Sequence, residues 1–130
     1  MSPAARRIMA FVSAVAVAAA IVIGLHVLAE QVSPTTGNAG LKRTLEEGEM
    51  PFTNLVLVLG GWLVAAWVGG TIASRVSRQR GPLLVFTVLA TAMLVVDFRG
   101  VPHPTWMWIA GVCGVPLLAL GAAGESITVR

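Results

Sequence analysis

Charged residues are scarce in this sequence. Only 12% of its 130 residues are Asp, Glu, Lys or Arg, whereas 56% are hydrophobic. A water-soluble domain usually carries about a quarter charged residues, so a globular fold of this composition would expose much apolar surface to water. The low charge therefore excludes an ordinary soluble domain and predicts that membrane lipids cover most of the chain.

Cysteine is nearly absent as well. The one thiol, Cys113, lies inside an apolar segment, so the chain has no internal disulfide and no thiol pair for redox exchange. We interpret it as a small core residue. The sequence also lacks an HExxH motif and a glycine-rich phosphate loop, so no motif identifies a cofactor or a catalytic group.

Four long apolar blocks are present instead, and they predict an all-α fold. A helix rises about 1.5 Å per residue and a bilayer core is about 30 Å thick, so about 20 apolar residues span it. The predicted transmembrane helices cover residues 8–29, 54–74, 82–96 and 105–123. The chain is then a single membrane domain over residues 1–130, an integral membrane four-helix bundle.

Two of these blocks raise a question of length. The first is longer than the apolar region of a typical signal peptide, so we expect an uncleaved anchor. The third holds only about 15 residues before Asp97 and predicts local bilayer thinning or a partly interfacial end. Residues 30–53 are predicted to form an outer loop, in which 41–47 could make an amphipathic turn on the membrane surface.

The basic residues predict the orientation of the bundle, because cytoplasmic loops carry an excess of Lys and Arg. With both termini in the cytoplasm, six of the nine basic residues lie inside and three outside. The inner set is Arg6, Arg7, Arg75, Arg78, Arg80 and Arg130, and the outer set is Lys42, Arg43 and Arg99. Basic residues at block ends form no stripe, so nucleic acid is not an expected partner. Short loops without soluble domains favour a multi-pass protein of a bacterial cell inner membrane.

Small residues recur every four positions in the second block. One row is Gly61, Ala65, Gly69 and Ala73, and Gly70 lies in a parallel row beside it. Small side chains at this spacing let another helix approach closely. The partner helix belongs either to the same chain or to another subunit.

Tryptophans are the other distinctive feature of the helices. Trp106 and Trp108 lie near the outer end of the last block, where aromatic rings anchor to lipid headgroups. Trp62 and Trp67 lie in the second block and face either lipid or another helix.

Ionisable residues collect near the predicted outer face: His26, Glu30, Asp97 and His103. Imidazoles and carboxylates are suitable ligands for a divalent metal, although the spacing matches no metal motif. In a purely structural alternative, Asp97 pairs with Arg99 or caps the last helix, and His26 bonds a neighbouring helix. A working site requires His26 to reach a carboxylate or an ion, and a metal site requires three converging side chains.

The sequence supports three hypotheses of function. The first is a noncatalytic membrane protein that acts by helix association, as a homo-oligomer or as an accessory subunit of a larger membrane complex. The second is a small oligomeric transporter or channel that uses His26, Asp97 and His103. The third is a metal-binding protein or an enzyme at the outer face, based on the same polar residues.

Overall fold

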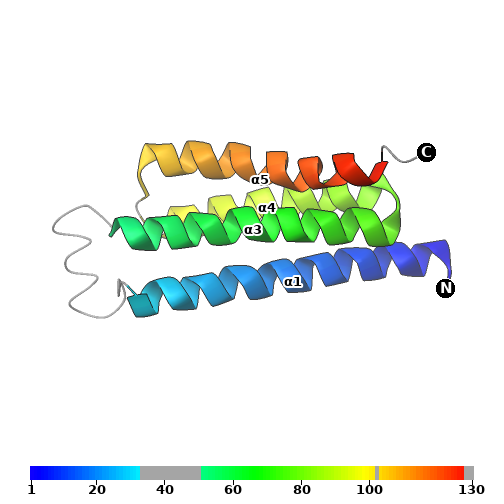
Figure 1. Ribbon diagram of the computed structural model, residues 1–130, viewed down its shortest axis with the longest axis horizontal. Coiled ribbons are helices and arrows are strands. Elements are labelled where there is room, and N and C mark those ends of the chain that lie inside the picture. The colour runs from blue at the N-terminus through cyan, green and yellow to red at the C-terminus, as the bar shows by residue number, and fades with distance from the viewer. Residues whose placement is uncertain (33–50, 102, 128–130) are drawn as a thin grey trace.

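The computed structural model describes residues 1–32, 51–101 and 103–127. These residues form helices and short connections without a strand, so the predicted all-α fold class is confirmed. The helices lie side by side with their long axes roughly aligned (Figure 1). They are α1 (Pro3–Val32), α3 (Phe52–Ser77), α4 (Arg80–Gly100) and α5 (Thr105–Ile127).

Each of the four helices is long and apolar enough to cross a membrane. Three of them extend beyond the predicted bounds at both ends, and α5 extends beyond its predicted C-terminal bound. Pro116 lies inside α5 without ending the helix. Proline is tolerated in helices of this kind because neighbouring groups compensate the lost backbone hydrogen bond.

The predicted bounds of α4 were wrong. The helix has 21 residues rather than about 15, and Asp97 lies within it instead of after it. At about 1.5 Å per residue the helix is about 31 Å long, so bilayer thinning is unnecessary. The helix continues past Val96 because the Asp97 carboxylate has hydrogen-bond partners on neighbouring helices.

The connection between α3 and α4 is a tight turn. Arg78 has left-handed backbone angles, φ 54° and ψ 24°, and its N–H donates to the Ser74 carbonyl at 2.9 Å. The turn makes α3 and α4 antiparallel neighbours. At the other end, residues 30–32 continue α1 and residues 52–53 begin α3, and the predicted amphipathic turn at 41–47 lies outside the described residues.

Helix α3 is the centre of the bundle, because it contacts α1, α4 and α5. Helix α1 packs mainly on α3 and touches α4 less. The five small residues of the two predicted rows are all buried, namely Gly61, Ala65, Gly69, Gly70 and Ala73.

Three glycines of α3, namely Gly61, Gly69 and Gly70, each face a different helix of the same chain. A Cβ added to Gly61 would lie 3.1 Å from Cβ of Leu25 in α1. The corresponding Cβ on Gly69 would collide with the Phe86 ring of α4. On Gly70 it would lie 2.5 Å from the carbonyl oxygen of Ala119 in α5. The contacts of these glycines are therefore intramolecular.

Cys113 differs from its predicted place. It is exposed on α5 instead of buried in the core. The apolar sequence around it indicated burial, but an apolar helix of this bundle also has an outward face that lipid can cover.

Candidate functional site

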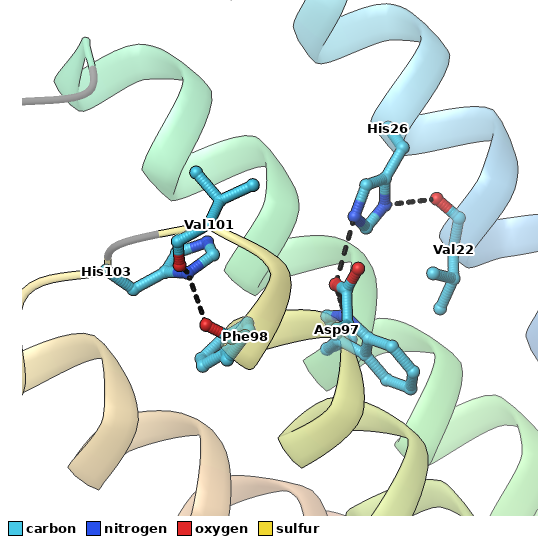
Figure 2. A network of polar contacts seen from close by, with 7 residues as sticks. Val22, His26, Asp97, Phe98, Val101 and His103 are labelled. Carbon is cyan, nitrogen blue, oxygen red and sulfur yellow. Dashed lines mark hydrogen bonds and ion pairs between the residues drawn. The ribbon is translucent and has the colours of Figure 1, made fainter. Parts of the chain in front are cut away.

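A polar network joins three helices near one end of the bundle (Figure 2). The Nε2 atom of His26 in α1 lies 3.1 Å from Oδ2 of Asp97 in α4. The indole N–H of Trp62 in α3 donates to the same oxygen at 2.9 Å. The network thus brings together two residues of the predicted polar cluster and Trp62, which was expected to face either lipid or another helix.

The second nitrogen of the His26 ring has its own partner. Nδ1 donates to the carbonyl oxygen of Val22, one turn earlier in α1, at 2.8 Å. This bond fixes the ring over its own helix and directs Nε2 toward Asp97 (Figure 2). The His26 side chain is 34% exposed and that of Asp97 is 36% exposed, so both are partly shielded.

Trp62 is the site residue that the sequence analysis missed. Its side chain is 8% exposed, whereas that of Trp67 is 55% exposed. A buried indole N–H usually has an acceptor, which in this bundle is Asp97. The helical spacing could have indicated its place. Trp62 lies on the same helix face as the small residues that point into the bundle, namely Ala65, Ala66 and Gly69.

His103 belongs to a separate group. Its ring stacks on Phe98 with centroids 4.4 Å apart, and Nδ1 lies 2.7 Å from the Val101 carbonyl oxygen. Figure 2 shows this ring turned away from His26. Its role in the structure is to hold the connection between α4 and α5 against the end of α4.

The other predicted residues do not complete a ligand set. Glu30 is half-buried one turn beyond His26. In the part of the chain that the structure describes, no three His, Cys, Asp or Glu side chains gather as metal ligands would. Within that part Asp97 also has no ion pair with Arg99, and its carboxylate binds His26 and Trp62 instead.

The two tryptophans at the start of α5 lie at the same end of the bundle as the polar network. Trp106 is largely exposed and its ring lies 6.2 Å from that of Phe52. Trp108 is partly buried and meets the Phe98 ring edge-on at 5.4 Å. The two tryptophans thus belong to two separate aromatic pairs.

An apolar groove of about 480 Å³ begins at the polar network. Its walls come from α1 and α4, and its floor comes from α3. Ala65, Ala66 and Phe86 are buried at the bottom, whereas Ile23 and Met93 on the rim are exposed. The carboxylate of Asp97 and the ring of Trp62 line one part of this groove.

No family model, curated protein or solved structure matches the chain.

The two hydrogen bonds of the His26 ring determine how many protons the His26–Asp97 pair holds. The Val22 carbonyl oxygen can only accept, so Nδ1 of His26 carries a hydrogen. Nε2 faces an oxygen of Asp97. A hydrogen bond there requires either an imidazolium facing a carboxylate or a neutral imidazole facing a carboxylic acid. In both forms the pair shares one proton and has no net charge.

Loss of this proton changes the contact between the helices. The neutral ring then has one N–H. If it stays on Nδ1 it bonds Val22 and leaves Nε2 and Oδ2 as two facing acceptors, and if it moves to Nε2 it bonds Asp97 and the Val22 bond is lost. In both tautomers the carboxylate keeps a single negative charge. The Trp62 N–H would remain as its donor. The site can therefore bind and release one proton, and the ring keeps both hydrogen bonds, to Val22 and to Asp97, only while that proton is bound.

Proposed function

We propose that the chain is a multi-pass membrane protein that works as a small proton-linked transporter, with the His26–Asp97 pair as its proton-binding site. The observation that carries this proposal is the position of the His26 ring between two hydrogen-bond acceptors. Ionisable groups are costly at membrane depth and are seldom kept there without a partner or a function. A ring that keeps both of its hydrogen bonds only when it is protonated is suited to couple protonation to movement of α1 against α4.

The arrangement of basic residues supports a membrane position with both termini in the cytoplasm. The start of α1 and the α3–α4 turn lie at the same end of the bundle (Figure 1). Under the positive-inside rule that end is cytoplasmic, which directs the His26–Asp97 pair toward the outer face. The described arginines at that end are Arg6, Arg7, Arg75, Arg78 and Arg80, against Arg99 at the other. A bacterial inner membrane fits this arrangement.

Proton binding can be measured directly at His26. We expect nitrogen NMR of the protein in lipid bilayers to show a His26 ring protonated at Nδ1 that titrates together with Asp97. The variant Asp97→Asn keeps an acceptor but removes the titrating carboxylate, so it should move the His26 midpoint. The variant His103→Gln assigns the two histidine signals and should move that midpoint less than Asp97→Asn does.

Transport is tested in proteoliposomes with a pH-sensitive dye inside. With an organic cation loaded inside, an inwardly directed proton gradient should drive proton uptake by the wild-type protein and by His103→Gln. Uptake should fall to the level of empty liposomes in Asp97→Asn and His26→Gln, provided that both variants reconstitute as folded protein. Equal uptake by Asp97→Asn and wild type would exclude the pair as the working site.

Association is the second candidate function, and one observation favours it. Helix α1 lies at the edge of the bundle and exposes Ala16, Ala20 and Gly24 at four-residue spacing. A Cβ added to Gly24 would meet nothing within 4 Å. The row would admit a helix of a second copy or of a larger complex. Mass measurement in mild detergent tests it, and a monomeric wild-type protein would count against the row.

A further inference from the structure

The groove between α1 and α4 has one polar end and otherwise apolar walls. Its volume of about 480 Å³ lies within the range of about 300–1,000 Å³ that holds drug-sized molecules. Rim residues such as Ile23, Met93 and Val96 are exposed on the outer side of the bundle. In a bilayer that side faces lipid, so a ligand can enter the groove sideways from the hydrocarbon region.

The polar end of the groove offers a hydrogen-bond acceptor. Both hydrogen bonds that Asp97 accepts, from His26 and from Trp62, end on Oδ2. The Asp97 side chain lines the groove and is 36% exposed, so part of the carboxylate is open to a bound molecule. The partner that a carboxylate prefers in apolar surroundings is a positive charge.

The charges around His26 limit what can bind. Glu30 follows on α1, Asp97 and Arg99 come from the end of α4, and His103 precedes α5. Helix α3 presents no ionisable side chain between Phe52 and Ser74. When the His26–Asp97 pair holds its proton it is neutral, and when it has lost the proton it carries one negative charge.

We infer that this groove binds a lipophilic organic monocation from the membrane in exchange for the proton on His26, which rests on the proton-binding site proposed above. The cation enters from lipid as the Nε2 proton of His26 leaves to water at the adjacent end of the bundle. The carboxylate of Asp97 is then neutralised by the cation. One positive charge enters and one leaves, and no covalent bond other than N–H is broken.

The walls of the groove select the kind of cation. The rings of Trp62 and Phe86 line it, and aromatic rings attract cations over their faces. A metal ion would exchange its water shell for a single carboxylate, because no group of three His, Cys, Asp or Glu ligands exists among the described residues. An organic cation with apolar substituents keeps its charge near Asp97 and buries the rest of its surface against alanines and Leu89.

Tetraphenylphosphonium is a suitable probe, measured by equilibrium dialysis with the full-length protein in mild detergent. Below the His26 titration midpoint, one proton should be released for each cation bound. The apparent affinity should fall by about tenfold for each pH unit below that midpoint, because proton and cation compete for one site. The hydrophilic cation tetramethylammonium should bind more weakly because it buries little apolar surface.

Three variants locate the binding in the groove. Asp97→Asn should weaken binding by about tenfold or more, since the negative charge is lost. Ala90→Phe fills the groove and should weaken binding similarly while leaving the His26 midpoint in place. Ala92→Phe is the matched control, because Ala92 is exposed on the same helix and does not line the groove.

The outcomes separate the two proposals. A His26 signal that titrates independently of Asp97 overturns the proton-binding site itself. A coupled titration with equal tetraphenylphosphonium binding in wild type, Asp97→Asn and Ala90→Phe overturns only the groove as a cation site. If Asp97→Asn does not fold, the comparison of Ala90→Phe with Ala92→Phe still decides.

Discussion

Gly70 of α3 lies directly against the backbone of Ala119 in α5. A Cβ added to Gly70 would lie 2.5 Å from the Ala119 carbonyl oxygen and 2.8 Å from its Cα. Among the described glycines, Gly70 is the one whose added Cβ would meet the backbone of another helix. A neighbouring side chain can change rotamer, but a helix backbone can move only as a unit. The distance between α3 and α5 therefore depends on this glycine.

The variant Gly70→Ala should separate α3 from α5. We expect it to lower the free energy of unfolding by about 1–3 kcal/mol, the usual cost of overpacking a core. Gly60→Ala is the matched control on the same helix, because its added Cβ would meet nothing within 4 Å. Unfolding in mixed micelles measures both, and equal losses in the two variants would contradict the close contact.

The hydrogen bond from Trp62 to Asp97 should contribute to stability through its N–H. Trp62→Phe keeps an aromatic ring but removes the donor. The free energy of unfolding should fall by roughly 1–2 kcal/mol, which lies between the usual value of a hydrogen bond in a membrane protein and that of a hydrogen bond to a charged group. Trp67→Phe, at an exposed position of the same helix, should have little effect.

A double-mutant cycle separates this hydrogen bond from the packing of the ring. In an Asp97→Leu background the acceptor is gone, so replacing Trp62 by Phe should cost less than it does in the wild type. An unchanged cost would mean that the indole stabilises the bundle by packing alone.

The sequence predicted the helices well and the site in part. Blocks of apolar residues determine membrane-length helices directly, so the fold class followed from composition and block length. The end of α4 did not follow, because a charged residue such as Asp97 after an apolar block normally indicates the end of a membrane helix. A charged residue ends an apolar block only if it has no partner inside the bundle, and the partners of Asp97 come from α1 and α3.

Which of the polar residues contact one another was also not predictable from the sequence. His26, Asp97 and His103 all lie near one end of the bundle, but the sequence does not give the rotation of each helix about its axis. That rotation turns His26 toward Asp97 and leaves His103 stacked on Phe98. The small residues of α3 did carry rotational information, since the face that holds Gly69 also holds Trp62.

Two arginines near the α3–α4 turn should respond in opposite ways to replacement by glycine: one replacement should raise the stability of the protein and the other should lower it. Arg78 has a left-handed conformation, which costs an ordinary residue about 1–2 kcal/mol. Arg78→Gly should therefore stabilise the protein by about 1 kcal/mol. Arg75→Gly removes the same charge from the last turns of helix α3 and should destabilise it by about 1 kcal/mol. Destabilisation by both variants would indicate that charge, not backbone conformation, matters at this turn.

The orientation of the bundle predicts which ends react from outside the cell. Ser77 is unsuitable for labelling because it is buried and donates to the Ala73 carbonyl. Gln79 in the α3–α4 turn and Val101 after α4 are exposed at opposite ends, and single cysteines can be placed there in a Cys113→Ala background. An impermeant thiol reagent added to intact cells should modify the cysteine at position 101 and spare the one at 79, because the arginines around the turn favour the cytoplasm. Modification of the cysteine at 79 without lysis would show that the orientation is the opposite one, with the His26–Asp97 pair on the cytoplasmic side.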